Sequence, residues 1–192
     1  MSNRPYVCPA ELSGSLDNIF RRLVHNPRKI LVPYISEDMT VLDLGCGPGY
    51  FTVELARLVG QGGRVIAADL QQKMLDKMTG KIRGTGLEKI VEEHLCQIDR
   101  IGINRKVDFI LAFWMVHEVP DQLRMFAEMK SLLNPGGRIW IIEPKIHVNK
   151  KSFINMVARL ESAGLEITER PKISISRTVM ISPNTISKLT VI

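Results

Sequence analysis

A glycine-rich turn between an apolar strand and the helix after it is the first feature of this sequence that could do chemistry. The turn reads DLGCGPGY and starts at Asp43. Its glycines, Gly45, Gly47 and Gly49, would let the backbone bend sharply and approach a ligand with no Cβ in the way. A dinucleotide site would carry G-x-G-x-x-G and seat a pyrophosphate on the helix N-terminus, whereas here Tyr50 takes the place of the third glycine. The carboxylate of Asp43 would repel a diphosphate, so the turn favours a ligand that bears an ammonium and a sulfonium.

A second acid stands at the end of the next apolar segment. Asp69 closes the run VIAAD and is followed by Leu70. An acid at this place, about twenty residues past a glycine turn, can accept hydrogen bonds from the hydroxyls of a ribose. The alternative is that Asp69 only caps the helix that begins near Gln71. Because strand, turn and acid occur together, ribose binding is favoured, with Leu70 as a further contact.

Two histidines could act on a second substrate. His117 stands with Glu118 after the fourth predicted strand, and His147 follows Glu143 after the fifth. An imidazole titrates near neutral pH and can remove a proton from an attacking group. We expect His117 or His147 to face this substrate as its base; the alternative is that His117 only packs there and orients the backbone. These four side chains are suitable metal ligands, but their spacing puts them on no common helix face, and we expect no metal site.

The cysteines favour no thiol chemistry. Cys8, Cys46 and Cys96 are an odd number and have no metal-ligand spacing. Cys46 is expected to be a small residue of the glycine turn, and Cys96 a buried residue of a strand. Cys8 has no assigned role.

The elements that must position these residues alternate between strand and helix. Short apolar runs predict seven strands, at residues 41–44, 64–68, 90–96, 107–113, 138–142, 165–169 and 173–180. The turn sequence NPGG precedes the fifth of them. Apolar residues at helical spacing predict four helices, along Phe51, Leu55, Leu58 and Val59, along Met74, Leu75, Met78 and Ile82, along Leu123, Phe126, Met129 and Leu133, and from Phe153 to Leu160.

This alternation predicts an α/β fold, a doubly wound sheet that is mostly parallel with helices on both faces. The last two strands are joined by a turn at Arg170-Pro171 and predict an antiparallel hairpin at one edge. In such sheets ligands bind beyond the carboxyl ends of the strands, where the strand order reverses. The glycine turn, Asp69, His117 and His147 all follow predicted strands, so they should meet at this edge.

The length of 192 residues fits a single domain. We assign residues 40–192 to the core and residues 1–39 to an N-terminal helical extension. The extension either folds over the site as a lid or packs on the edge of the sheet, with Tyr6, Phe20 and Tyr34 as its aromatic contacts. A second short helix should open at Asn26-Pro27, an N-cap followed by proline. The first helix of the extension follows an amphipathic pattern at Leu16, Ile19, Phe20, Leu23 and Val24.

Four segments in this order resemble the class I S-adenosylmethionine-dependent methyltransferases. They read VLDLGCGPGYFTVELA, VIAADL, DFILAFWMVHEV and LLNPGGRIWIIEP and extend from Thr40 to Pro144. The resemblance implies a seven-stranded Rossmann-like sheet of order 3-2-1-4-5-7-6 with the last strand antiparallel. It also implies S-adenosylmethionine as the cofactor and S-adenosylhomocysteine as the product.

The same resemblance implies roles for single residues. The three glycines of the turn would line the methionine portion of the cofactor with the help of Asp43, Asp69 would bind the ribose, and Phe113 would contact the methionine end. Many relatives carry an acid after the third strand that bonds the adenine amino group. Here Gln97 stands at that place and Asp99 two residues further on. A glutamine oxygen can accept the same hydrogen bond, so the choice between Gln97 and Asp99 stays open.

Composition limits the partners of this protein. The net charge is +6, but the basic residues occur in small groups, as on a solvated basic surface. A nucleic-acid partner is therefore possible but not favoured, and the segment FWMV after the fourth strand lacks the Asn/Asp-Pro-Pro-aromatic pattern of enzymes that methylate base nitrogens. No apolar run approaches the roughly 20 residues that span a bilayer, and the first residues do not resemble a secretory signal. We expect a cytoplasmic protein with no membrane partner.

Together these features predict methyl transfer from S-adenosylmethionine to a small-molecule acceptor of unknown identity. The alternatives are a tRNA or rRNA methyltransferase and a non-catalytic protein that binds the cofactor; the missing third glycine argues against a nicotinamide-dependent dehydrogenase. Methyl transfer is an in-line displacement that needs a collinear, close nucleophile, and it needs a base only if the acceptor arrives protonated. The attacking atom (O, N, S or C) and the oligomeric state stay open.

Overall fold

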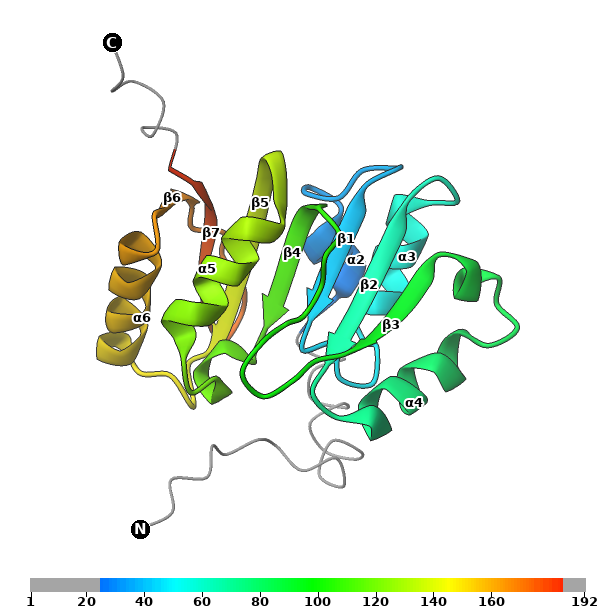
Figure 1. The fold of residues 1–192 in the computed structure, drawn as a ribbon, viewed down its shortest axis with the longest axis horizontal. Coiled ribbons are helices and arrows are strands. Elements are labelled where there is room, and N and C mark those ends of the chain that lie inside the picture. The colour runs from blue at the N-terminus through cyan, green and yellow to red at the C-terminus, as the bar shows by residue number, and fades with distance from the viewer. Residues whose placement is uncertain (1–24, 185–192) are drawn as a thin grey trace.

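The chain folds around one seven-stranded sheet in the order β3-β2-β1-β4-β5-β7-β6 (Figure 1). The structure is a computed structural model and describes residues 25–184. β7 is antiparallel to both of its neighbours, while the pairs from β3 to β5 are parallel. The predicted fold class, strand order and antiparallel last strand are thereby confirmed. The strands are β1 Thr40–Leu44, β2 Arg64–Asp69, β3 Val91–Leu95, β4 Val107–Phe113, β5 Leu133–Pro144, β6 Leu165–Glu169 and β7 Ser176–Pro183.

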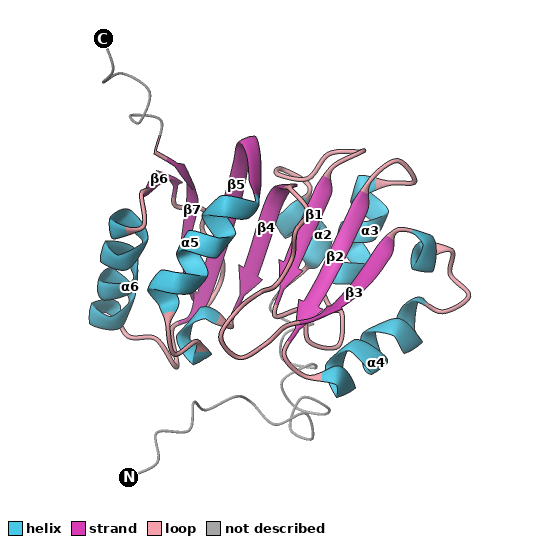
Figure 2. Cartoon of the chain, viewed as in Figure 1, coloured by secondary structure: helices cyan, strands magenta, loops and turns pink. Residues whose placement is uncertain are grey.

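Helices cover both faces of this sheet (Figure 2). On one face α3 (Thr52–Val59) and the short α2 (Pro27–Leu31) bury Leu55 and Leu31 against strand residues such as Phe109 of β4, and α4 (Gln72–Ile82) packs beside them on Ala67. On the other face α5 (Gln122–Leu132) and α6 (Lys150–Ser162) pack on the alternate strand residues, such as Ile110 of β4. The alternation of side chains along each strand thus supplies two apolar layers.

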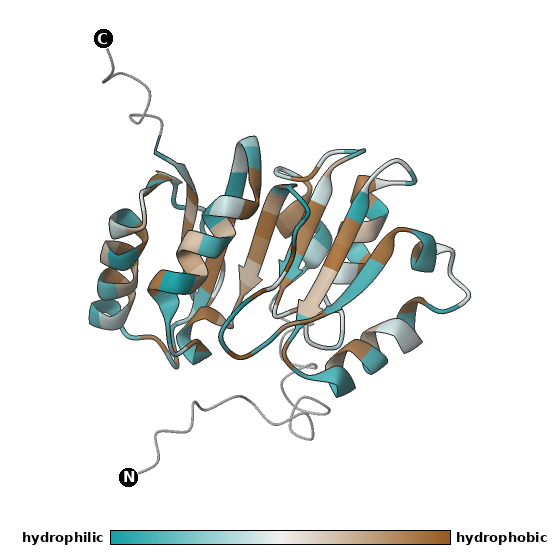
Figure 3. Cartoon of the chain, viewed as in Figure 1, coloured by the Kyte–Doolittle hydropathy of each residue, from teal (hydrophilic) through white to brown (hydrophobic). Residues whose placement is uncertain are grey.

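The central strands consist mainly of apolar residues because they are buried on both faces (Figure 3). β3 differs, since it is an edge strand of mixed composition in which Glu92, Glu93 and Leu95 are exposed. The connection from β3 to β4 contains no helix. Instead Glu128 of α5 accepts the backbone N–H groups of Ile101 and Gly102, at 2.9 and 2.7 Å.

The helical stripes were predicted with one error. All four residues expected to face the core from α4 are buried. In α5 the buried stripe is Met125, Phe126, Met129 and Leu132; Leu123 belongs to this helix as predicted but is 48% exposed. Leu123 lies in the first turn of α5 and beside the stripe. Leu133, predicted to continue this helix, is instead the first residue of β5.

The start of β5 also differs from the prediction. The strand was expected from Arg138, after the NPGG turn, but it is assigned from Leu133. Val107 pairs with Leu133 while Phe109 pairs with Arg138, so β5 accommodates the turn residues as a bulge against β4. Two short 3-10 helices were not predicted, η2 at Leu87–Lys89 and η3 at Val116–Glu118.

The N-terminal extension is described only from residue 25 onward. The predicted N-cap is confirmed, because the side chain of Asn26 accepts from the backbone of Lys29 at the start of α2. Tyr34 packs against Trp140 of β5 with 4.7 Å between ring centroids, so this residue contacts a central strand of the sheet. The expected first helix, with Tyr6 and Phe20, and the unassigned Cys8 lie outside the described residues, so the lid stays a prediction.

Candidate cofactor and acceptor site

The carboxyl ends of the parallel strands bring the predicted site residues to one edge of the sheet. The parallel strands lie side by side in the order β2, β1, β4 and β5. The strand order reverses at β1, which has β2 on one side and β4 on the other. The glycine turn follows β1 and bonds back to β2, since the N–H groups of Gly45 and Cys46 both donate to the carbonyl of Ala68 at 2.8 and 3.0 Å. This is the switch point at which doubly wound sheets bind ligands.

The three glycines of the turn need to be glycine for different reasons. All have positive φ, 73° at Gly45, 54° at Gly47 and 78° at Gly49. A Cβ on Gly45 would lie 2.8 Å from Met115, and one on Gly49 would lie 2.5 Å from Met78. A Cβ on Gly47 would meet no protein atom within 4 Å. The turn therefore packs on the protein at its two ends and faces open space at Gly47, where a ligand could approach the backbone.

Asp43 lies beneath this turn. Its side chain is in the last part of β1, is 2% exposed, and accepts a hydrogen bond of 2.6 Å from the hydroxyl of Thr52 in α3. The carboxylate thus joins the strand to the helix on either side of the glycines. Its negative charge adjoins the turn, as the expected contact with a cationic ligand requires.

Asp69 holds the turn from the end of β2. One carboxylate oxygen accepts from the backbone of Gly47 at 2.9 Å, and the other accepts from the backbone of Gln71 at 2.9 Å. Burial raises the pKa of Asp69, and the hydrogen bonds from Gln71, Gly47 and Leu70 oppose this rise. Gln71 immediately precedes α4, so the hydrogen bond from its backbone is the kind of contact that the helix-capping alternative for Asp69 requires. The ribose contact predicted for Asp69 and Leu70 stays a prediction beside it.

Gln97 and Asp99 lie on the loop after β3 and are both exposed. Arg100 donates to the side-chain oxygen of Gln97 at 2.7 Å, and Arg124 of α5 pairs with Asp99 at 3.3 Å. Which of the two side chains binds adenine stays open.

An aromatic cluster follows β4. Phe113 is buried and lies 4.3 Å from the ring of Phe51, measured between centroids. Trp114 has a φ of 59°, which is unusual for a bulky residue, and its indole donates to Ser176 at 3.0 Å. The ring of His25 packs edge-on against both Phe113 and Trp114. The cluster thus packs His25, the first described residue, against the end of β4.

His117 and Glu143 form a dyad beside this cluster. The Nδ1 atom of His117 lies 2.5 Å from one carboxylate oxygen of Glu143, and the other oxygen accepts from the backbone of Val116 at 2.9 Å. Glu143 is fully buried in β5, whereas the His117 side chain is 25% exposed. The carboxylate therefore fixes the imidazole with Nδ1 as the donor, which leaves the lone pair on Nε2 when the ring is neutral.

The environment of His117 raises its pKa. Partial burial alone would lower the pKa, but the hydrogen bond and charge of Glu143 and the charge of Glu118 outweigh it. The exposed ring of His147 stacks on His117 with 5.7 Å between centroids and 11° between planes. The structure thus brings both predicted histidines to one place and gives the carboxylate partner to His117.

Sequence reasoning missed the link between His117 and Glu143 and the strained Trp114. Glu143 had a signal that could have found it, because it is a single acid within the apolar run IWIIEP, and a buried acid needs hydrogen-bond donors. The positive φ of Trp114 has no such signal, since tryptophan does not favour that conformation.

Two cysteines, Cys46 and Cys96, lie among the described residues. Burial raises the pKa of the Cys46 thiol above its ordinary range and that of Cys96 to about 12, so neither is a thiolate at neutral pH. Both are free thiols. Among residues 25–184, no three His, Cys, Asp or Glu side chains are grouped so that they could hold a metal ion.

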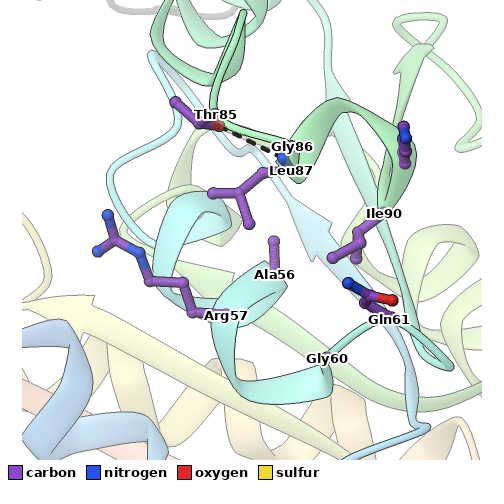
Figure 4. A pocket seen from close by; sticks show the side chains of 9 residues that line it. Ala56, Arg57, Gly60, Gln61, Thr85, Gly86, Leu87 and Ile90 are labelled. Atoms are coloured by element: carbon purple, nitrogen blue, oxygen red, sulfur yellow. Dashed lines mark hydrogen bonds between the residues drawn. The ribbon is translucent and has the colours of Figure 1, made fainter.

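One cavity of about 400 Å³ lies at the opposite edge of the sheet (Figure 4). Ala56 and Arg57 of α3 line it together with the segment before β3, including Leu87 and Ile90. Because β2 and β3 begin at this edge, the cavity is remote from the glycine turn. We assign it no part in the site.

The sequence and the fold match known methyltransferases. A family described as a methyltransferase domain matches residues 35–176. The chain belongs to this family. A SAM-dependent methyltransferase from Aquifex aeolicus has a similar structure, with a TM-score of 0.79 and 27% sequence identity over 90% of this chain and 97% of that one. The resemblance to class I methyltransferases is confirmed, and with it S-adenosylmethionine as the cofactor.

Curated relatives match a shorter part of this methyltransferase. A demethylmenaquinone methyltransferase of Lactobacillus johnsonii is 37% identical over 53% of this chain and 42% of its own length. A ubiquinone/menaquinone biosynthesis C-methyltransferase of Klebsiella pneumoniae is 32% identical over 57% of this chain and 44% of its own length. The chain thus spans less than half of the length of these relatives in the matched region.

Proposed function

We propose that this methyltransferase acts on a small-molecule acceptor whose attacking group carries a proton, and that His117 removes that proton. The observation that carries the proposal is the dyad of His117 and Glu143, which lies at the same sheet edge as the glycine turn. Methyl transfer needs a base when the nucleophile arrives protonated, and histidine is the common choice near neutral pH.

The residues of the glycine turn fit the cofactor. Gly47 presents bare backbone to open space, because a Cβ there would meet no protein atom within 4 Å. The carboxylates of Asp43 and Asp69 supply negative charge on either side, which suits the ammonium, sulfonium and ribose of S-adenosylmethionine. When bound, this cofactor supplies a methyl group that its sulfonium makes electrophilic. Asp43, the three glycines and Asp69 would hold it.

Glu143 would act through His117 as a positioning residue. Its buried carboxylate accepts from Nδ1, so the neutral ring has its lone pair on Nε2. It also holds Val116, so the turn that carries His117 is fixed to β5. His147, stacked on His117, is an alternative or second contact to the acceptor.

The first acceptors to test are phenols and quinols. The curated relatives carry names that refer to demethylmenaquinone and to C-methylation. A base that deprotonates a phenolic hydroxyl raises the nucleophilicity of the oxygen and also of the ring carbon beside it. One dyad therefore serves either O- or C-methylation.

The experiment is an assay for S-adenosylhomocysteine release with a panel of quinols, phenols, amines and thiols. We expect turnover with a hydroxyl-bearing aromatic acceptor and a fall of about 100-fold or more in kcat for His117→Ala, as for the loss of a general base. Affinity for S-adenosylhomocysteine should stay unchanged in that variant. Turnover that is equal in both proteins would refute the role of His117, and turnover only with RNA would refute the small-molecule acceptor.

A further inference from the structure

Two loops at the carboxyl edge carry unpaired positive charge. Residues 144–152 read PKIHVNKKS and residues 170–177 read RPKISISR, with no aspartate or glutamate in either; we call them the basic loops. Most arginines elsewhere in the described chain, such as Arg28 and Arg105, pair with carboxylates. Within residues 25–184, five exposed cations of the basic loops form no ion pair: Lys145, Lys150, Lys151, Arg170 and Lys172.

The basic loops form one continuous surface. Pro144 pairs with Ser176 at the end of β5 and the start of β7. Beyond that pair, the backbone of Lys145 donates to the carbonyl of Ile175 at 2.9 Å. The guanidinium of Arg177 donates to the carbonyl of Val148 at 3.1 Å. These bonds tie the connection from β5 to α6, at the lower edge of Figure 1, to the segment that precedes β7.

Isoleucines project from this charged surface. The carbonyl of Pro144 accepts from both His147 and Val148, so the first basic loop forms a tight turn with Ile146 at its tip. Ile146 is 86% exposed, and Ile175 beside it is 40% exposed. Exposed isoleucines in loops that also carry several cations are a combination that binds lipid head groups and the acyl boundary beneath them.

The first turn of α6 adds to this argument. Lys150 and Lys151 occupy it, and it contains no acidic residue. Cations at a helix N-terminus are unfavourable because the partial positive charge of the helix dipole repels them. No carboxylate of the described chain pairs with either lysine. An external anion would compensate for both effects.

We propose that the basic loops dock the protein on the surface of an anionic lipid bilayer, with Ile146 and Ile175 entering the head-group layer. The proposal rests on the proposed function in one respect. His147 belongs to the first basic loop and stacks on His117, so docking turns the acceptor site toward the lipid, where an apolar acceptor would dissolve. No helix among the described residues has the length and apolarity to cross a membrane. The proposal replaces the expectation of no membrane partner with contact at the bilayer surface.

Two other partners fit these loops less well. Single-stranded nucleic acid is held by cations together with aromatic rings on which bases stack, and the basic loops contain no Phe, Tyr or Trp. A second copy of this chain would bring the same patch against itself in a two-fold interface. Since the basic loops contain no acidic residue to pair with these cations, the charges of the two copies would repel each other.

The experiment measures binding of the full chain to sedimented vesicles. The vesicles are phosphatidylcholine alone or phosphatidylcholine mixed with phosphatidylglycerol, each in low and high salt. We expect binding to the anionic vesicles that salt weakens. Lys150→Gln with Lys151→Gln should bind about 30-fold more weakly, or about 2 kcal/mol, as for two charges near an anionic surface. Ile146→Ser should also weaken binding, without changing its salt dependence.

Matched controls lie outside the basic loops. Arg83→Gln with Lys89→Gln removes two exposed cations of the segment between α4 and β3, and Val32→Ser removes an apolar side chain that is 50% exposed. Both should bind as the parent does. Equal binding to neutral and anionic vesicles, no binding, or an equal loss in the controls would overturn the proposal, as would binding of RNA or self-association in its place. His117→Ala should still bind vesicles, so a failure of the proposed base leaves this test intact.

Discussion

The acceptor half of the site depends on one buried carboxylate. Glu143 is fully buried, and both of its oxygens accept hydrogen bonds, from His117 and from the backbone of Val116. A buried charge is costly unless it is paired and hydrogen-bonded, so this residue has a structural reason to be where it is. The same contact orients the imidazole and raises its pKa. Structure and proposed chemistry are therefore coupled at a single side chain.

Replacing Glu143 by glutamine should lower the pKa of His117. The neutral amide removes the charge that stabilises the imidazolium, while partial burial still disfavours it. His117 works as a base only when neutral, so activity of the parent should fall as pH drops below its raised pKa, and this fall should move to lower pH in Glu143→Gln. Titration of the histidine resonances by NMR measures the shift directly. An unchanged pKa would contradict the dyad.

Replacing Asp69 by asparagine should weaken cofactor binding. An amide has one acceptor oxygen, so it cannot accept from both Gly47 and Gln71 as the carboxylate does. We expect an affinity for S-adenosylhomocysteine about tenfold lower, or about 1.4 kcal/mol, by calorimetry. Asp76→Asn, on the exposed side of α4, is the control and should leave the affinity unchanged. Equal affinities in all three proteins would leave Asp69 as a capping residue.

At the scale of elements, the sequence predicted the strands better than their connections. All seven strands were predicted, and the central parallel ones most clearly, because buried parallel strands are continuous apolar runs, as in β4. The early start of β5 was missed, since the NPGG residues have turn propensity and only tertiary pairing makes them a bulge. Side-chain contacts across strands, such as His117 to Glu143, depend on register and so could not be read from spacing.

The bulge itself is held by Asp108 of β4. One oxygen of this carboxylate accepts from the backbone of Thr40 at 2.9 Å, and the other accepts from the side chain of Asn134 at 2.7 Å. Asp108→Ala should lower the free energy of unfolding by about 2 kcal/mol, because it leaves a partly buried N–H without its acceptor. Urea denaturation measures this loss. Affinity for S-adenosylhomocysteine should not change, since these contacts lie at the amino edge of the sheet.

At the scale of the whole molecule, the sheet places the glycine turn, Asp69 and the dyad of His117 and Glu143 at one edge, where we propose that cofactor and acceptor bind. His117 also links this site to the stability of the fold. Its folded pKa is raised above the unfolded value of about 6.5. The contribution of the dyad to stability is therefore fully present below that value and is lost as pH rises through the folded pKa.

This dependence can be isolated with His117→Gln. The difference in free energy of unfolding between parent and variant should be largest at acidic pH and should shrink as pH rises past the folded pKa. Denaturation in urea over a pH series measures the difference, and the other titrating groups cancel in the comparison. A difference that grows with pH would mean that His117 is stabilised in its neutral form.

The central claim is that the bound cofactor lies against the backbone of the glycine turn. Two matched glycines test it most directly. Gly47 and Gly84 both have positive φ, 54° and 73°, and a Cβ on either would meet no protein atom within 4 Å. Alanine at each should therefore cost about the same stability, roughly 1–2 kcal/mol. Calorimetric titration with S-adenosylhomocysteine should give parent-like binding for Gly84→Ala and a loss of about 100-fold or more for Gly47→Ala, where the methyl group would occupy the ligand's place. Equal binding by the two folded variants would contradict the claim.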